Sequence, residues 1–121
     1  MRLPILLVAD VLNENFKEVN WFTNEVPEEF QSLPELPVGR IVELYSDYDA
    51  YASSNPNYHT ATVQIDVWVN NVSEIENYYF EIDRTMRDAG YHCAFSEETY
   101  EPDLEGSRRL VKRYTVSQYI G

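Results

Sequence analysis

Few residues in this chain are suited to nucleophilic or acid–base catalysis. His59 and His92 are far apart in the sequence, and Cys93 is the single cysteine. Because adjacent residues of a strand point to opposite faces, we do not expect His92 and Cys93 to form a nucleophilic pair. A small buried thiol is the simpler interpretation of Cys93. With one cysteine no intrachain disulfide forms, which suits a reducing compartment.

One segment resembles the start of a metal-binding loop. Asp47-Tyr48-Asp49 begins like an EF-hand, but the sixth position is not glycine and Tyr58 stands where the twelfth should be glutamate. The chain also lacks a glycine-rich phosphate loop, a CxxC pair and an HExxH motif. We therefore expect no metal, no other cofactor and no catalytic residue. The sequence favours a protein that is not an enzyme.

The segment from Thr60 to Gly90 predicts one strand followed by one helix. Apolar residues alternate with polar and aromatic ones over Val63–Val69, the period of a half-buried strand. Trp68 falls on the strand face opposite the valines. It packs either in a second core layer with the N-terminal helix or against a partner protein.

The helix has start and stop signals of its own. Ser73 followed by Glu76 is a capping-box pattern, and Gly90 occupies the position of a left-handed C-cap. The residues expected to form its core-facing stripe are Ile75, Tyr79, Ile82, Met86 and Ala89.

The same patterns predict the remaining elements. Before the central strand they are a helix over Pro4–Asn13, an ambiguous Phe16–Phe22 with a possible strand at Val19–Phe22, a connector over Thr23–Gly39 with one helical turn at Glu28–Ser32, a strand over Arg40–Ser46 and a loop over Asp47–His59. After the main helix they are a strand over Tyr91–Tyr100, a turn over Glu101–Gly106 and a strand over Arg108–Tyr119. We expect Tyr91, Cys93 and Phe95 to share one face of the first of these strands, and Leu110, Tyr114 and Val116 to share one face of the last. Together they indicate a single domain over residues 1–121. Its expected class is α+β: a mostly antiparallel sheet of about four to five strands, with one main helix and a short N-terminal helix packed on it.

The segment Asp47–His59 combines turn-forming residues with three tyrosines and contains no aliphatic residue larger than alanine. A long loop of this kind is usually functional or mobile. We expect it to be poorly ordered in an isolated subunit and to become ordered against a neighbour.

The charge of the chain is strongly acidic. Nine basic and twenty-one acidic residues give a net charge of −12, which repels nucleic-acid phosphates and anionic lipids and argues against a nucleic-acid-binding protein. The apolar run Leu3–Ala9 is too short to span a membrane, and no cleavage pattern of a secretory signal follows it.

Four of the nine basic residues lie close together near the end of the chain: Arg108, Arg109, Lys112 and Arg113. They form either a solvated strand edge or a basic patch that meets an acidic patch on a neighbouring subunit.

Aromatic residues point to a protein interface. Ten tyrosines and two tryptophans are many for a chain of 121 residues, and aromatic residues are enriched where proteins meet. The expected interface residues are Asp47, Tyr48, Tyr51, Tyr58, Trp68, Arg108, Arg109, Lys112 and Arg113.

Three motifs support a resemblance to a known family. They are Val63-Gln-Ile-Asp-Val-Trp68, then Ile82-Asp83-Arg84 within the helix, then Tyr100-Glu-Pro-Asp103 before a basic strand. This order resembles the tail-terminator and tail-completion proteins of long-tailed phages, above all a small family in siphophages of lactococci and related Gram-positive hosts. The resemblance covers residues 60–119 best and residues 1–40 in outline.

The resemblance implies a structural role without catalytic residues. Proteins of this family form a hexameric ring at the head-proximal end of the tail tube, stop tube polymerisation and join the tail to the head. The implied partners are further copies of the chain, the major tail protein and the head–tail connector protein. DNA would pass through the ring without specific binding. The implied location is the virion tail, after synthesis in the host cytoplasm, with no membrane contact.

Three alternatives stay open. The chain is another ring component of the virion, such as a head-closure or tube protein. It is a small adaptor or inhibitor whose acidic surface mimics nucleic acid. It is an enzyme with a metal at the Asp47–Asp49 segment.

Overall fold

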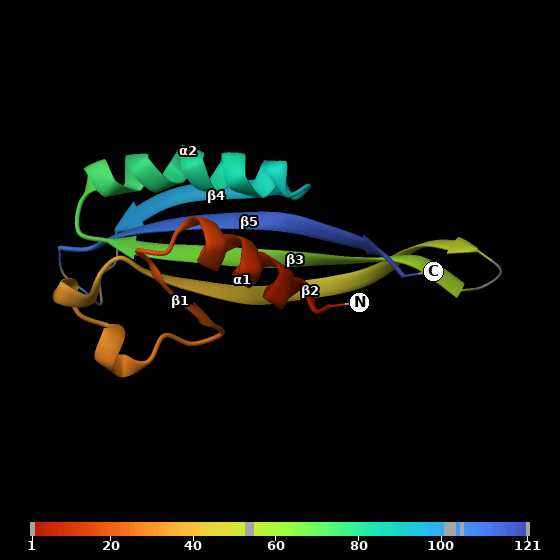
Figure 1. Cartoon of the computed structure of the whole chain (residues 1–121), viewed down its shortest axis with the longest axis horizontal. Helices are drawn as coiled ribbons and strands as arrows, with labels where there is room; N and C mark the ends of the chain where they lie inside the picture. Colours follow the sequence, from red (N-terminus) through yellow and green to blue (C-terminus); the bar gives the residue numbers. More distant parts are fainter. Residues whose placement is uncertain (1, 53–54, 101–103, 105, 121) are drawn as a thin grey trace.

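The computed structural model describes residues 2–52, 55–100, 104 and 106–120, with only the backbone described for 47–52 and 55–57 (Figure 1). In chain order the elements are α1 (Pro4–Asn15), β1 (Asn20–Thr23), the 3-10 turns η1 (Glu28–Phe30) and η2 (Leu33–Glu35), β2 (Val38–Ala52), β3 (Asn55–Val69), α2 (Val72–Asp88), β4 (His92–Tyr100) and β5 (Arg108–Tyr119). The strands form one sheet in the order β1-β2-β3-β5-β4. Only the β1–β2 pairing is parallel among the described pairs, so the predicted α+β class with a mostly antiparallel sheet is confirmed.

Both helices pack on the same face of the sheet. The alternating apolar residues of β3 meet Val8 and Leu12 of α1 and the buried side chains of α2 in one core. The core residues of β3 are Val63, Ile65, Val67 and Val69, and those of α2 are Ile75, Ile82 and Met86. Since α1 shares the valine face of the sheet, the structure excludes the alternative in which Trp68 packs in a second core layer with α1.

The ends of α2 follow standard capping chemistry, although the start differs from the predicted one. The side chain of Asn71 accepts a hydrogen bond from the Glu74 amide at 3.1 Å, and Glu74 Oε2 accepts one from the Asn70 amide at 2.9 Å. This reciprocal pair makes Asn71 the N-cap, so the predicted cap at Ser73 was wrong by two residues.

The other end of α2 confirms the glycine cap. Gly90 has a φ of +93°, and the Tyr91 amide donates to the Met86 carbonyl at 2.9 Å, as in a Schellman motif. Ile75, Ile82 and Met86 of the predicted stripe are buried, and Tyr79 is partly buried. Ala89 is exposed because it is the C-cap residue, so its place in the stripe was a wrong prediction.

The segment predicted as a loop is instead the outer part of a long hairpin. β2 and β3 are each 15 residues long, and their pairing continues from Val38↔Trp68 to Ala52↔Asn55. The hairpin arm is the name used here for residues 45–60, of which the described residues 45–52 and 55–60 extend past both helices (Figure 1). Tyrosine and threonine favour strands, and the end of β5 supports the base of the arm through the pairing of Tyr58 with Tyr119. The loop prediction for Asp47–His59 was therefore wrong. Residues 53–54 lie outside the described chain.

The edge strand β4 contains an irregularity that redirects its side chains. The pairing with β5 shifts between Cys93 and Phe95, which places Cys93 opposite Tyr114 and Phe95 opposite Arg113. One extra residue at a bulge inverts the alternation that follows it. Cys93 and Phe95 therefore do not share a face as predicted, and Cys93 is exposed rather than buried.

The connector between β1 and β2 joins two parallel strands. It contains the helical turn predicted within Glu28–Ser32 and an unpredicted second turn, η2. At its end Gly39 lies under the ring of Trp21, where a Cβ would come within 2.2 Å of a ring carbon. Glycine at this position therefore lets β1 pack closely on β2. None of the described helices is long and apolar enough to cross a membrane.

Candidate functional site

The sheet face that points away from the helices, named here the open face, carries a cluster of polar and aromatic side chains. Alternation along β3 places Gln64, Asp66 and Trp68 on this face. The strand register places Arg40 of β2 opposite Asp66 and Arg109 of β5 opposite Trp68. Four strand residues on either side of a buried carboxylate thus converge without any loop.

Asp66 is the centre of this cluster and is 0% exposed. Arg40 donates from Nε and Nη2 to Oδ2 of Asp66 at 3.0 and 2.8 Å. Arg109 donates from Nε and Nη2 to Oδ1 at 3.0 and 2.7 Å, and Gln64 Nε2 donates to the same oxygen at 3.1 Å. Charge-assisted bidentate pairs of this kind compensate the cost of burying a carboxylate. The cluster fixes the direction of both guanidinium groups.

Trp68 lies within reach of both arginines. The guanidinium carbons of Arg40 and Arg109 are 5.5 and 5.4 Å from the centre of the indole ring, which is within cation–π range. The ring is therefore held between two charged groups that Asp66 holds in turn. This geometry makes a rigid surface at the end of the sheet where β3 meets α2.

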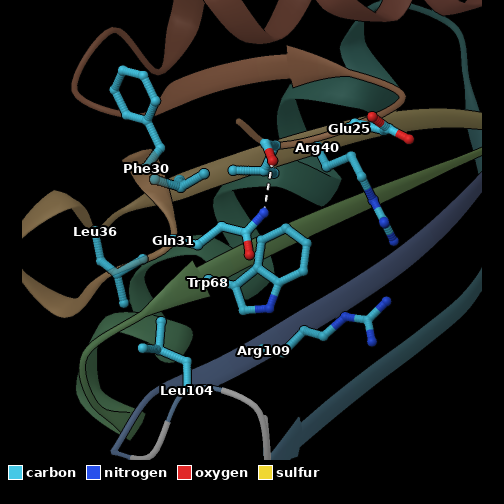
Figure 2. Close-up of a pocket in the computed structure, with 10 residues that line it drawn as sticks. Glu25, Phe30, Gln31, Leu36, Arg40, Trp68, Leu104 and Arg109 are labelled. Atoms are coloured by element: carbon cyan, nitrogen blue, oxygen red, sulfur yellow. Dashed lines mark hydrogen bonds between the residues drawn. The ribbon is translucent and has the colours of Figure 1, made fainter. Parts of the chain in front are cut away.

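A pocket of about 420 Å³ opens beside this surface. Its walls come from the open face and from the connector before β2, and the lining residues are Glu25, Val26, Phe30, Gln31, Leu36, Val38, Arg40, Trp68, Leu104 and Arg109. Figure 2 shows Phe30 and Leu36 at one end of the pocket and the guanidinium groups of Arg40 and Arg109 at the other. The Gln31 side chain lies at its wall and donates a hydrogen bond to the Val26 carbonyl at 2.7 Å. The pocket thus combines an apolar wall with hydrogen-bond donors.

Arg113 extends the polar surface along the open face. Its Nε donates to Gln64 Oε1 at 3.0 Å, and its guanidinium carbon lies 4.8 Å from the ring centre of Phe95. Gln64 therefore bridges Arg113 to Asp66. Arg40, Arg109 and Arg113 form one row of cations in a chain of net charge −12.

The predicted basic cluster is divided between the two faces of β5. Lys112 lies on the helix-covered face and is buried, with Nζ 3.0 Å from Asp83 Oδ1, 2.8 Å from Ser96 Oγ and 3.8 Å from the ring centre of Tyr79. Tyr114 on the same face donates a hydrogen bond to Asp83. Because Lys112 is enclosed within its own subunit, it is not available to a neighbour in this fold.

Tyr114 and Arg108 also lie on the helix-covered face of β5. Burial raises the pKa of the Tyr114 hydroxyl well above its usual range, and the hydrogen bond to Asp83 adds to the rise. Arg108 is half-buried and forms an ion pair with Glu98 of β4. Of the four bases, only Arg109 and Arg113 therefore belong to the open face.

The remaining predicted interface residues lie on the hairpin arm or beside it. The side chains of Asp47, Tyr48 and Tyr51 lie outside the described part of the structure. Tyr58 is 42% exposed, and its ring centre is 5.5 Å from that of Tyr119. Trp68 and Arg109 both line the pocket, and Trp68 pairs with Val38 at the opposite end of the β2–β3 ladder from the Ala52↔Asn55 pair of the arm.

Sequence reasoning missed Arg40, Gln64 and Asp66 as site residues. The sequence did contain a signal for this site: Gln64 and Asp66 are polar residues on one face of a strand whose other face is aliphatic over Val63–Val69. Polar side chains in a central strand must find partners when buried, so Asp66 required cations from β2 and β5. Which cations would meet it depended on the register, which the sequence pattern alone did not specify.

The chemistry of the open face is that of recognition. Its fixed donors and aromatic ring suit hydrogen bonding to an anionic or carbonyl oxygen together with contact to an apolar group.

Within the described residues, no group of three or more histidine, cysteine, aspartate or glutamate side chains is placed to hold a metal ion. Comparison with models of known protein families and with curated proteins gives no match.

Proposed function

We propose that this chain is a non-enzymatic subunit of a hexameric ring at the head-proximal end of a siphophage tail. The ring ends polymerisation of the tail tube and joins the tail to the head. The motifs around Gln64, Asp66 and Trp68 supply the resemblance from which this role comes. The observation that carries the proposal is the hairpin arm, which extends past both helices as a ready contact for a neighbour (Figure 1).

The surface around the arm supports an interface. Tyr45 is 67% exposed, Tyr119 is 63% exposed and Tyr58 is 42% exposed, all near the base of the arm. Large exposed aromatic side chains are typical of protein contacts, and the ring centres of Tyr58 and Tyr119 lie 5.5 Å apart. A folded arm also loses less conformational entropy on binding than a mobile loop of the same length. The arm is therefore better suited to assembly than the loop expected from the sequence.

The negative charge of the subunits would repel both DNA and other subunits of such a ring. Six subunits of charge −12 carry a formal charge of −72. An acidic channel wall repels phosphates, so the genome slides through without binding. The same charge makes the subunits repel one another, and salt screens that repulsion. Ring formation is accordingly weak at low protein concentration and is completed on the end of the tail tube.

Shortening the arm tests this role. Residues 50–57 are replaced by Asn-Gly, a two-residue turn that joins the paired positions Asp49 and Tyr58. We expect the shortened chain to fold, as judged by circular dichroism and thermal melting, but not to assemble into rings on tail tubes seen by electron microscopy.

The shortened chain tests the arm, and the location and partners of the full-length chain separate the alternatives. Tails of regulated length capped by rings of the shortened chain would contradict the role of the arm. A full-length chain found along the tube wall or in the head would indicate another ring component of the virion. A monomer that binds a basic DNA-handling protein would support the acidic adaptor.

A further inference from the structure

The pocket beside Trp68 has donors that its own subunit leaves unused. Arg40 and Arg109 each use Nε and Nη2 to hold Asp66. Within the described residues, Nη1 of each arginine has no hydrogen-bond partner. Both arginine side chains line the pocket and are more than a quarter exposed. They are fixed in direction before any ligand arrives.

The charge around the pocket defines what it accepts. Arg40 and Arg109 together with Asp66 carry one net positive charge, and Arg113 adds a second further along the face. Glu25 at the rim opposes them, since its carboxylate also lines the pocket. The apolar end formed by Phe30 and Leu36 suits an aromatic ring or an aliphatic group of a ligand. The matching ligand is thus a carboxylate carried beside an aromatic side chain.

The hairpin arm of the same chain has this composition. Residues 45–60 include two aspartates, Asp47 and Asp49, four tyrosines, and no lysine or arginine. The connector that lines the pocket lies at the opposite end of the long axis of the subunit from the arm (Figure 1). A subunit therefore cannot fill its own pocket, whereas a second copy placed end to end presents its arm to it.

We propose that the pocket beside Trp68 receives the hairpin arm of a neighbouring copy, with an arm carboxylate bound by Nη1 of Arg40 and Arg109. The inference rests on the proposed ring and names the contact that builds it. The two surfaces are different and lie at opposite ends of the subunit. Such a heterologous contact repeats from copy to copy and closes into a ring when the rotation permits.

Two nearly isosteric changes test the electrostatics in opposite directions. Gln31→Glu adds a negative charge at the pocket wall, and Glu25→Gln removes one from its rim, while neither touches the Asp66 cluster. We expect the first to weaken self-association and the second to strengthen it, each by roughly twofold to fivefold per contact, as measured by sedimentation velocity over a concentration series. Equal association of both variants and the wild type would overturn the proposal.

A mixing experiment tests the end-to-end arrangement. Gln31→Trp fills the pocket but keeps the arm, and the double variant Asp47→Asn, Asp49→Asn keeps the pocket but lacks both arm carboxylates. We expect each variant alone to remain monomeric and an equimolar mixture to form only a heterodimer, because one intact contact remains. Gln31→Ala, which removes the same hydrogen bond to Val26 without filling the pocket, is the matched control and should still assemble.

The outcomes distinguish this inference from the proposed function. Rings that form normally with Gln31→Trp would overturn the pocket contact and leave the ring itself standing. A mixture that stays monomeric while the wild type forms rings would also overturn the contact. A wild-type chain that stays monomeric both alone and on tail tubes would overturn the ring and, with it, the inference.

Discussion

Arg109 reaches diagonally across the sheet to Asp66. In the strand register Arg109 stands opposite Trp68, yet its Nη2 lies 2.7 Å from Oδ1 of Asp66. Arg40 approaches the other carboxylate oxygen from the opposite strand at 2.8 Å. One buried carboxylate therefore aligns two guanidinium groups on either side of an indole ring. Reversing the charge of Arg109 would place a second carboxylate beside Asp66, so that change would test folding before it tested assembly.

The first prediction concerns this carboxylate. Asp66→Asn removes the charge that compensates Arg40 and Arg109, and we expect a loss of about 3–5 kcal/mol in the free energy of unfolding. Urea unfolding followed by circular dichroism measures the change. Glu97→Gln is the matched control, because this exposed residue lies on the same face opposite Val111. A loss for Asp66→Asn as small as that of the control would show that the cluster is not needed for folding.

The second prediction compares two bases on one face of β5. Lys112 is enclosed by Asp83, Ser96 and Tyr79, whereas Arg108 is half-buried beside Glu98. We expect Lys112→Ala to cost about 3–5 kcal/mol because it leaves Asp83 without its cation. We expect Arg108→Ala to cost about 1 kcal/mol or less, as for a solvent-screened pair. Similar losses of unfolding free energy for both variants in denaturant melts would show that the two bases contribute equally to stability and would refute this prediction.

The third prediction concerns the core stripe of α2. Ile82 is 0% exposed and Phe80, two residues earlier, is 67% exposed. Ile82→Ala removes buried methylenes and should cost about 2–5 kcal/mol, while Phe80→Ala should change stability by less than about 1 kcal/mol. Equilibrium unfolding of the two variants is the check. A larger loss at Phe80 would mean that the opposite face of α2 is the buried one.

The fourth prediction is a loss of stability at alkaline pH. Burial first, and the hydrogen bond to Asp83 second, raise the pKa of Tyr114 in the folded chain, so its hydroxyl stays neutral while an unfolded tyrosine ionises near pH 10. The stabilisation is present in full below about pH 10 and declines as the pH rises further, by up to about 1.4 kcal/mol per pH unit for this tyrosine.

Tyr114→Phe removes this proton linkage. Its stability should therefore fall less steeply above about pH 10 than that of the wild type. Comparing the slopes of stability against pH, rather than the values at one pH, separates this effect from the lost hydrogen bond to Asp83. Parallel slopes for the two proteins would count against the assignment.

The sequence predicted those parts of the fold that local pattern specifies. The alternation over Val63–Val69 and the helical stripe from Ile75 to Met86 are confirmed because each periodicity reflects one buried face. The glycine at position 90 is confirmed because only the left-handed conformation suits that cap. The bounds of β5 are confirmed as well.

The errors arose where tertiary contacts override local composition. Aspartate and asparagine in the hairpin arm resemble a loop, but Asp47, Asp49 and Asn55 pair with the neighbouring strand and are extended. A bulge at Ala94 redirected Phe95, and no local signal gave its position. The candidate site was only partly foreseen: Trp68 and Arg109 were expected to act at an interface, but their link through Asp66 depends on the register of three strands.

If copies of this chain form a ring, the mass of the assembled species must show it. Native mass spectrometry of the purified chain over a concentration series, with and without tail tubes, measures that mass. We expect a species of six times the 14.2 kDa subunit mass whose share grows with protein concentration, and no series of larger open oligomers. A chain that stays monomeric at every concentration, including on tail tubes, would contradict it.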